Sequence, residues 1–486
     1  MAYKIGDQMQ TIYLPPIIDD YVSKDAPVRV YDAFVDSLNF YELGIPLEAS
    51  MQGGAYSYYP KQILKLLLYG YSSGIRSSRK LEKACHENLS FIWLMGGLKP
   101  DYRTISRFRS LYKEAITKVL KQCVRMCLKL DLIEGNVFFT DGSKFRANAS
   151  INKTRSKEGC EEYIKKIEER IEQVINESEQ IDAKERDDQS LVKLKEQVHD
   201  KAKLINKMKD VLNILNTQNK ENINSTDTDC VKAISRQGTH AAYNVQSTTD
   251  GKHGLIIQAQ AVSQSTDFNQ LSVQVQAASE NVGKMPQHAC ADAGYSDVDD
   301  ARKIDPQINI IVPSINQAQE EKGLVPVHPF DKRHFVYDAQ TNEYICPNGK
   351  RLESIGFKDQ EHNKIRYQAN GLECQACHHF GDPHLGKCTQ SLNGRRITRL
   401  ADEKFKEQLE ANYKRPENQT IYALRKETVE HPFGHMKHNL GAGQFMLRGI
   451  AKVNAEVSLL ATCFNLARMI TIAGGISQLL GKLVSS

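Results

Sequence analysis

Residues 136–144 read Asn-Val-Phe-Phe-Thr-Asp-Gly-Ser-Lys, and this stretch decides the class of fold. Its apolar part, 136–140, is too short for a helix and fits a buried strand, so we expect a strand that ends at Asp141. The arrangement recurs where His288-Ala-Cys-Ala runs into Asp292. A strand end projects side chains into an open crevice, and carboxylate oxygens suit Mg²⁺ or Mn²⁺. For each aspartate taken alone, a turn former or helix cap is the alternative.

More strand patterns follow along the chain. We expect strands at 241–246 and 254–262, with a hairpin turn at 248–252 between them. A helix is expected over 268–280 and a short strand over 308–312. This order of strands and helices predicts an α/β fold with a mixed sheet.

Residues 1–135 have a different, helical texture. A dense apolar run over 61–71 predicts a buried helix, and a second helix is expected after Thr104 as its N-cap. Arginines gather near these helix starts: Arg76, Arg79, Arg103, Arg107 and Arg109. This pattern suits a small helical domain whose arginines bind DNA phosphates. That these arginines are only solvated surface residues is an equal alternative.

Residues 157–225 form a helical insertion in this interpretation. Apolar residues recur at three- and four-residue spacing from Ile164 to Ile181 and again from Leu191 to Leu215, with a polar stretch at 184–189 between them. This pattern predicts two antiparallel helices in a coiled-coil hairpin.

Residues 314–400 are a polar, cysteine-rich insertion. They contain Cys346, the pair Cys374-Gln-Ala-Cys377, and Cys388. Four thiols with one C-x-x-C pair predict a tetrahedral structural Zn²⁺ site, for which His378, His379 or His384 are substitutes for one cysteine. Free thiols are the alternative.

Composition limits the cellular setting. The chain has 486 residues, a formal net charge of +5 and eleven cysteines, and it starts without a secretory signal pattern. The charge permits nucleic-acid binding without demanding it, and the cysteines favour reduced thiols in the cytoplasm. The apolar stretch 453–472 is interrupted by Asn454, Glu456, Asn465 and Arg468, so no membrane span is expected.

The segment 422–437, Tyr-Ala-Leu-Arg-Lys-Glu-Thr-Val-Glu-His-Pro-Phe-Gly-His-Met-Lys, resembles the C-terminal signature of bacterial insertion-sequence DDE transposases. The motifs around Asp141 and Asp292 match the first and second acidic motifs of that group. The stretch from Tyr59 to Phe108 is similar to the group's helical N-terminal domain. The resemblance therefore covers most of the chain apart from the helical insertion.

This resemblance implies a ribonuclease-H-like catalytic domain. It implies that Asp141, Asp292 and Glu430 hold Mg²⁺ or Mn²⁺ for cleavage at element ends and for attack of the freed 3′-hydroxyl on target DNA. It further implies residues that position phosphates or a terminal nucleotide: Lys144, Arg146, Tyr422, Arg425 and Lys437. The implied partners are double-stranded DNA, as element terminal repeats and as target, and a second copy of the chain in a homodimer.

The spacing departs from the group at one point. Four residues separate Arg425 from Glu430, where the group has three, and Lys426 stands at the usual offset. Glu430 and Lys437 keep their usual spacing on one helix face, while Pro432 predicts that Glu430 lies in the first turn of that helix or at a kink. Glu427 is the rival third carboxylate.

The expected organisation has six segments. They are a helical DNA-binding domain (1–135), the first part of the catalytic domain (136–156), the coiled-coil insertion (157–225), the continued catalytic domain (226–313), the cysteine-rich insertion (314–400), and a catalytic helix with a helical tail (401–486). The alternatives to a transposase are a metal-dependent nuclease of the same fold, a non-catalytic DNA-binding derivative, and a coiled-coil interaction protein.

Overall fold

The computed structural model describes residues 17–48, 58–182, 188–218, 220–235, 238–323, 328–359, 364–400 and 402–485. The chain forms two compact units. The first contains Met1–Ala289 and Arg425–Ser486, and the second contains Cys290–Leu424. One boundary therefore falls inside the helix α16 (Pro416–Gly434).

Short helices make up the N-terminal part of the first unit. They are α1 (Val28–Ser37), α2 (Phe40–Leu43), α3 (Pro60–Ser72), α4 (Ser78–Glu87), α5 (Leu89–Leu94), α6 (Tyr102–Leu111), α7 (Lys113–Thr117) and α8 (Val119–Lys129). The buried helix expected over 61–71 is confirmed as α3. The N-cap expected at Thr104 is wrong, because Asp101 caps α6 by accepting a hydrogen bond of 2.7 Å from the Thr104 amide.

An antiparallel sheet forms the centre of the first unit. Its strands are β1 (Val137–Arg146), β4 (Val231–Ser235), β5 (Gly238–Asp250) and β6 (Ile256–Val262), in the order β4-β5-β1 with β6 also paired to β5. The prediction that β1 ends at Asp141 is wrong. The strand β5 continues past that point and pairs with β1 from Phe138 to Arg146, which overrides the turn tendency of Gly142 and Ser143.

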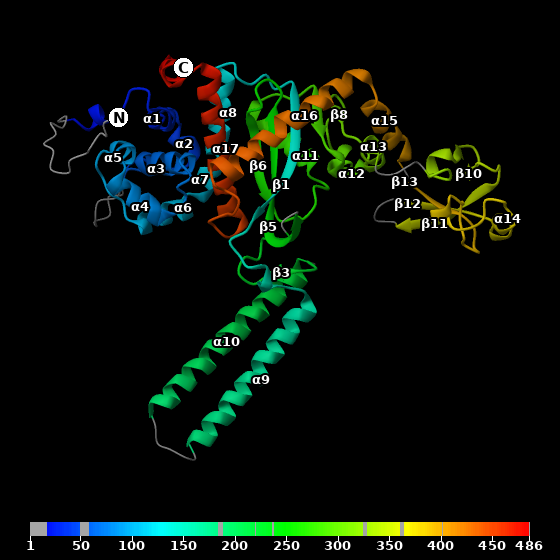
Figure 1. Cartoon of the computed structure of the whole chain (residues 1–486), viewed down its shortest axis with the longest axis horizontal. Helices are drawn as coiled ribbons and strands as arrows, with labels where there is room; N and C mark the ends of the chain where they lie inside the picture. The colour runs from blue at the N-terminus through cyan, green and yellow to red at the C-terminus, as the bar shows by residue number, and fades with distance from the viewer. Residues whose placement is uncertain are drawn as a thin grey trace, which may run out of the picture. The chain divides into compact units, whose positions relative to one another are not determined.

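The helix α17 (Ile450–Ala473) lies in the core of the first unit, against α3, α7, α8 and β6 (Figure 1). One hydrophobic cluster includes Leu67 of α3, Phe138 of β1 and Phe464 of α17, so residue 135 does not separate two cores. Within the described residues, α17 alone is long and apolar enough to cross a membrane, yet 72% of its most apolar window is buried in the protein. Such burial is typical of a core helix. A further helix, α18 (Ile476–Ser485), lies in the C-terminal segment for which a helical tail was expected.

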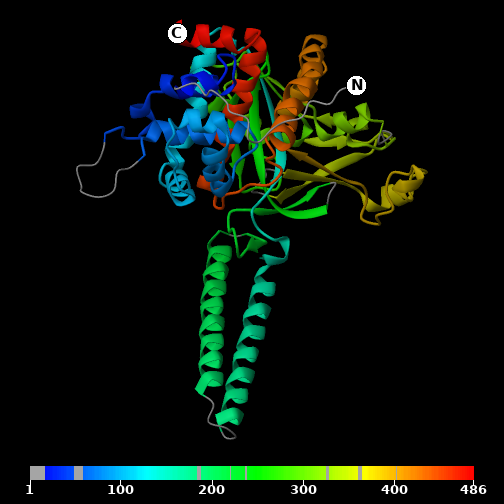
Figure 2. The same ribbon diagram turned by 60° about the vertical axis from the view of Figure 1, so that its left-hand side comes forward.

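Two long helices, α9 (Lys157–Asp182) and α10 (Asp188–Thr217), lie side by side in the first unit (Figure 2). The small strands β2 (Thr154–Arg155) and β3 (Ile223–Asn224) pair at their base. Ile164 and Ile167 of α9 pack in one cluster with Ile205 and Met208 of α10, as the apolar spacing predicts. The side chains of 177–198 lie outside the described residues.

The second unit contains short helices and its own sheet. After β7 (His288–Ala291), which crosses the unit boundary, come η3 (Ala293–Tyr295), α12 (Val298–Ala301), β8 (Asn309–Ile311) and α13 (Ile315–Glu321). A five-stranded antiparallel sheet follows, in the order β13 (Arg396–Leu400), β12 (Lys364–Ala369), β11 (Arg351–Asp359), β10 (Glu343–Ile345) and β9 (Val336–Asp338). The sequence predicted only a polar insertion here. Tyr344, Leu352 and Tyr367 form a small core beneath this sheet.

Candidate active site and cysteine pocket

Asp141 lies in the middle of β1, and its carboxylate is 19% exposed. Since side chains alternate between the two faces of a strand, Asp141, Ser143 and Phe145 share one face of β1. Ser247 of β5 stands directly opposite Asp141 on that face, and its buried hydroxyl has no hydrogen-bond partner among the described residues. This face of the sheet therefore places the Asp141 carboxylate opposite a hydroxyl group that has no hydrogen-bond partner among the described residues.

Arg425 of α16 lies against this face. Its Nη1 is 3.6 Å from Oδ1 of Asp141, and its side chain is 16% exposed. Lys426, which stands at the family's usual offset, is exposed. The structure thus brings Arg425, and not Lys426, to the first aspartate.

Lys437 contacts the same face of β1. Its Nζ donates a hydrogen bond of 2.6 Å to Oγ of Ser143 and lies 4.7 Å from the centre of the Phe145 ring. Burial lowers the pKa of Lys437, while the charge of Asp141 acts in the opposite direction. Two cationic side chains, those of Arg425 and Lys437, therefore lie close to Asp141.

Glu430 lies in the penultimate turn of α16, with an exposed side chain. The prediction that it lies in the first turn of the helix is wrong, because α16 begins at Pro416. The helix continues through Pro432 and changes to a π-helical turn, η6 (His435–Asn439), which carries Lys437. Glu427 is exposed as well, so exposure does not choose between the two candidates for the third carboxylate.

Lys144 and Arg146 lie on the other face of β1. The Nζ of Lys144 is 3.9 Å from Oδ1 of Asp267, whose carboxylate accepts hydrogen bonds of 2.7 Å from Asn244 and Gln246. Burial lowers the pKa of Lys144, and the charge of Asp267 opposes that shift. The predicted phosphate-contacting residues of β1 are therefore not on the Asp141 face.

In the second unit, Asp292 follows β7 directly, as predicted. Its Oδ1 accepts a hydrogen bond of 2.8 Å from the Gly294 amide and caps the short η3 turn. Tyr422, also in this unit, packs edge-to-face on Tyr413 at 5.0 Å between ring centres. Asp292 is half-buried, so its carboxylate has a structural role and some access to solvent.

The N-terminal arginines divide into two groups. Arg76 and Arg109 are buried, and Arg76 forms an ion pair of 2.6 Å with Glu456 of α17. The prediction that Arg76 contacts DNA is wrong, since its guanidinium is used inside the protein. Arg79, Arg103 and Arg107 are exposed, and the first two lie near the Tyr102 ring at 5.0 and 5.8 Å.

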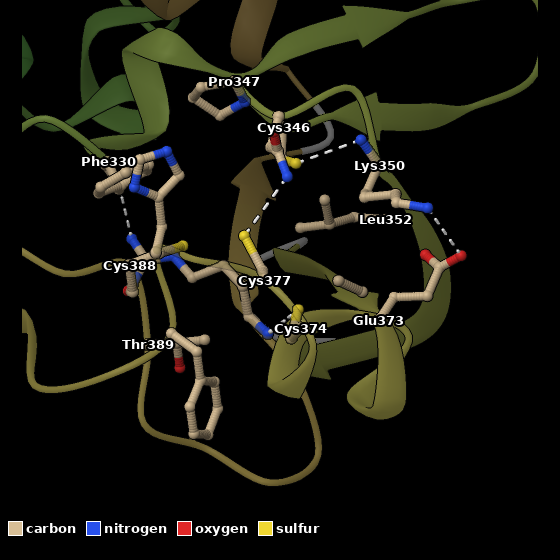
Figure 3. A pocket seen from close by; sticks show the side chains of 15 residues that line it. Phe330, Cys346, Pro347, Lys350, Leu352, Glu373, Cys374, Cys377, Cys388 and Thr389 are labelled. Carbon is tan, nitrogen blue, oxygen red and sulfur yellow. Dashed lines mark hydrogen bonds and ion pairs between the residues drawn. The ribbon is translucent and has the colours of Figure 1, made fainter.

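The four predicted zinc ligands line one pocket in the second unit: Cys346, Cys374, Cys377 and Cys388 (Figure 3). The sulfurs of Cys346 and Cys374 accept from the backbone amides of Lys350 and Arg395 at 3.3 and 3.5 Å. Burial and the other three thiols raise the pKa of Cys388, and Arg395 opposes the shift. Within the described residues, no group of three His, Cys, Asp or Glu side chains already has a metal-binding arrangement, here or around Asp141.

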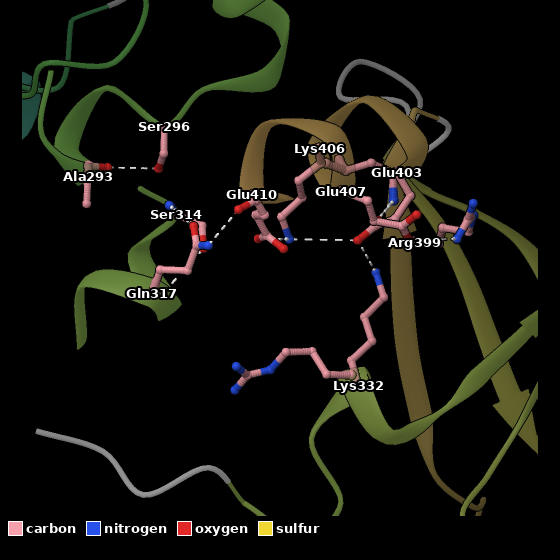
Figure 4. A network of polar contacts seen from close by, with 12 residues as sticks. Ala293, Ser296, Ser314, Gln317, Lys332, Arg399, Glu403, Lys406, Glu407 and Glu410 are labelled. Carbon is pink, nitrogen blue, oxygen red and sulfur yellow. Dashed lines mark hydrogen bonds and ion pairs between the residues drawn. The ribbon is translucent and has the colours of Figure 1, made fainter. Parts of the chain in front are cut away.

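A network of polar contacts links the insertion at 314–400 to α15 (Glu403–Tyr413) (Figure 4). Lys332 Nζ is 2.8 Å from Oε1 of Glu403, and Lys406 is 3.7 Å from both Glu403 and Glu410. Gln317 of α13 donates to the Glu410 carbonyl at 3.0 Å. The cysteine-rich segment is thus joined to the helix that precedes α16 in the chain.

Three polar residues that contact or pair with β1 were not found by sequence reasoning. Ser143, Ser247 and Asp267 reach their places through strand pairing and the loop after β6. A single sequence gives no signal for such long-range pairing, although Ser143 belongs to the motif around Asp141.

Comparison with known protein families gives two matches. Residues 345–470 match the transposase DDE domain family, and residues 16–111 match a transposase domain family (DUF772). The first match includes the cysteine pocket, Arg425, Glu430 and Lys437, and Asp141 and Asp292 lie outside both ranges. No curated protein and no solved structure matches the chain.

Two transposase domains in one chain indicate a DNA-processing enzyme. More narrowly, the matches support assignment of the chain to the insertion-sequence DDE transposases, so the resemblance predicted from the motifs is confirmed. Transposases act on DNA, which supports DNA as the partner, and the transposase DDE domain implies the use of a divalent metal in general.

Proposed function

We propose that this protein cuts DNA at the ends of an insertion sequence and joins the freed 3′-hydroxyl ends to target DNA. Asp141, Asp292 and Glu430 are the proposed catalytic carboxylates on a ribonuclease-H-like domain. The observation that carries the proposal is the pairing of Asp141 with Arg425 and the contact of Lys437 with the neighbouring Ser143. Both cations belong to the segment that matches the transposase DDE domain.

The residues around Asp141 fit a divalent cation. The half-buried carboxylate already attracts a guanidinium, and the unsatisfied hydroxyl of Ser247 lies opposite it. Asp141, Asp292 and Glu430 supply the hard oxygen ligands that Mg²⁺ and Mn²⁺ prefer. When bound, such metals activate the attacking oxygen and stabilise the leaving oxygen of an in-line displacement.

The cationic residues have separate proposed roles. Lys437 and Arg425 neutralise the DNA phosphate next to the scissile bond, and Tyr422 stacks on a terminal nucleotide. Lys144 and Arg146, on the opposite face of β1, are proposed to contact DNA phosphates away from the Asp141 site. Arg79, Arg103 and Arg107 contact phosphates through the N-terminal helices.

Incubation with DNA that bears the element's own ends, in the presence of Mg²⁺, tests the proposal. We expect Asp141→Asn, Asp292→Asn and Glu430→Gln each to abolish end cleavage while DNA binding persists. Glu427→Gln is the matched control, because Glu427 is an exposed carboxylate on the same helix. Cleavage that survives in all three variants would contradict the site, and loss in Glu427→Gln alone would make Glu427 the third ligand.

The same reaction separates the alternatives. A nuclease of the same fold gives cleaved ends without joined products, and a non-catalytic derivative binds the ends without cutting them. Joined products that depend on Asp141 support the transposase.

We also propose that Cys346, Cys374, Cys377 and Cys388 hold a structural Zn²⁺. The four thiols line one pocket, and backbone amides donate to two of the sulfurs, as is typical where thiolates bind a metal. The sulfurs must converge further for tetrahedral ligation. Metal analysis of the purified protein should find one zinc per chain, lost in Cys374→Ser and kept in the control Cys290→Ser. A zinc-free wild-type protein with four titratable thiols would contradict this site.

Two further proposals concern the assembly. Because two element ends must be cut together, we expect a homodimer on DNA in the bacterial cytoplasm. The helices α9 and α10 form a coiled-coil insertion whose exposed faces are available to a second copy. Light scattering with and without end DNA measures the dimer, and a variant that lacks 157–217 tests whether the insertion contributes.

A further inference from the structure

The ion pair between Arg425 and Asp141 places a cation at the proposed metal site. The two side chains are 16% and 19% exposed, and the Nη1–Oδ1 distance is 3.6 Å. Lys437 is also near, but its ammonium group is hydrogen-bonded to Ser143 and lies over Phe145. Arg425 is thus the cation paired with the carboxylate itself.

We infer that Arg425 is the counter-ion of Asp141 in the metal-free protein and competes with the divalent metal for this carboxylate. The inference rests on the proposed role of Asp141 as a metal ligand. An arginine stays charged at any pH at which the protein is folded, so deprotonation does not remove the competition. A guanidinium at this distance and a divalent ion on the same oxygen repel each other strongly in a partly buried site.

The competition has a consequence for DNA binding. When the metal occupies Asp141, the guanidinium of Arg425 must turn away from the carboxylate. A guanidinium released beside the metal matches the geometry of a DNA phosphate, which it can bind through two hydrogen bonds. Metal binding and DNA binding should therefore strengthen each other through Arg425, and such coupling is reciprocal.

Direct Mn²⁺ binding in the absence of DNA tests the competition. Electron paramagnetic resonance of free Mn²⁺ reports the affinity of the full-length protein without any catalytic step. We expect Arg425→Gln to bind Mn²⁺ about tenfold more tightly than the wild type, because a competing charge has been removed. Arg425→Lys keeps the charge and should stay close to the wild type. Lys426→Gln is the matched control, since it removes one positive charge from the adjacent, exposed position.

The outcomes separate this inference from the function on which it rests. Equal Mn²⁺ affinity in Arg425→Gln, Lys426→Gln and the wild type would overturn the counter-ion role. If Asp141→Asn binds Mn²⁺ as well as the wild type does, the proposed metal site is wrong instead. Arg425→Met gives the same comparison if the glutamine variant does not fold.

DNA affinity gives a second readout of the coupling. Ca²⁺ replaces Mg²⁺ in order to measure DNA binding without cleavage. The wild type should gain DNA affinity on addition of Ca²⁺, and Arg425→Gln should lose most of that gain while Lys426→Gln keeps it. An undiminished gain in Arg425→Gln would contradict the release of Arg425 to a phosphate.

Discussion

Arg76 and Glu456 form a buried ion pair in the first unit, with 2.6 Å between Nη1 and Oε1. Arg76 also donates to the Gly441 carbonyl, and Glu456 accepts from the backbone amides of Met446 and Leu447. Burial raises the pKa of Glu456, while Arg76 and the two amides oppose the shift. This pair joins the end of the α3–α4 connection to α17 and to the loop that follows Lys437.

Arg76→Ala should destabilise the first unit by about 3–5 kcal/mol, because it leaves a buried carboxylate without its partner. The double variant Arg76→Ala/Glu456→Gln should lose less than the sum of the single changes, since no unpaired charge remains. Urea unfolding followed through Trp93, the single tryptophan of the chain, measures both effects. Arg79→Ala is the control and should cost below about 1 kcal/mol, since Arg79 is exposed. Additive losses would show that the two side chains act independently.

Gly142→Ala should disturb the loop after β6. A Cβ at this position would lie 2.7 Å from Nε2 of Gln246 and still closer to the carboxylate of Asp267. Since Asn244 and Gln246 hold that carboxylate, we expect a loss of about 1–3 kcal/mol in stability.

Two variants control for the effect at Gly142. Asp267→Ala in the Gly142→Ala background should recover part of the loss by removing the clash. Gly434→Ala should be neutral or stabilising, because its added Cβ meets no atom within 4 Å and lies in a helix. Equal effects at Gly142 and Gly434 in thermal unfolding would contradict a steric origin.

The sequence could predict elements whose signal is local. The apolar spacing from Ile164 to Leu215 predicted α9 and α10, and the motif around Asp292 predicted β7 with its correct bounds. It could not predict that β1 continues past Asp141, because that depends on pairing with β5 about a hundred residues later.

Two further features were beyond local reasoning. The sheet β9–β13 was missed because its strands are polar and several are short, with a core of only a few residues such as Tyr344 and Tyr367. The buried role of Arg76 was missed because its partner is 380 residues away. In the candidate site, the family motifs identified Asp141, Arg425 and Lys437. Only the structure shows that these three lie at one face of β1 and that Lys144 lies on the other.

The second unit should lose folding stability in acid, because Glu403 is then protonated. Burial alone would raise the pKa of Glu403, but its contacts with Lys332, the Leu400 amide and Lys406 together lower it. A carboxyl group with a lowered pKa stabilises the fold above its unfolded value of about 4.5, and this stability is lost as the pH falls through the folded value. Burial lowers the pKa of Lys332 more than Glu403 raises it. This shift makes stability depend on pH only in the alkaline range, where Lys332 titrates.

Hydrogen exchange of β13 and α15 between pH 5 and pH 3 measures this acid response, after correction for intrinsic exchange rates. Protection should fall with pH in the wild type and should vary less in Glu403→Gln. Glu407→Gln is the control on the same helix, because its carboxylate is 62% exposed. If the acid response is unchanged in Glu403→Gln, other carboxylates cause it.

Salt dependence tests the exposed arginines of the N-terminal helices. If Arg103 and Arg107 each neutralise one phosphate, Arg103→Ala/Arg107→Ala should reduce the slope of log affinity against log salt by about 1.8. The weakening should be similar on end DNA and on unrelated DNA, because phosphate contacts carry no sequence information. Lys129→Ala, at the exposed end of α8, is the control and should leave the slope unchanged. An unaltered slope in the double variant would show that these two arginines are solvated surface residues without phosphate contacts. A loss of affinity confined to end DNA would indicate contacts with bases.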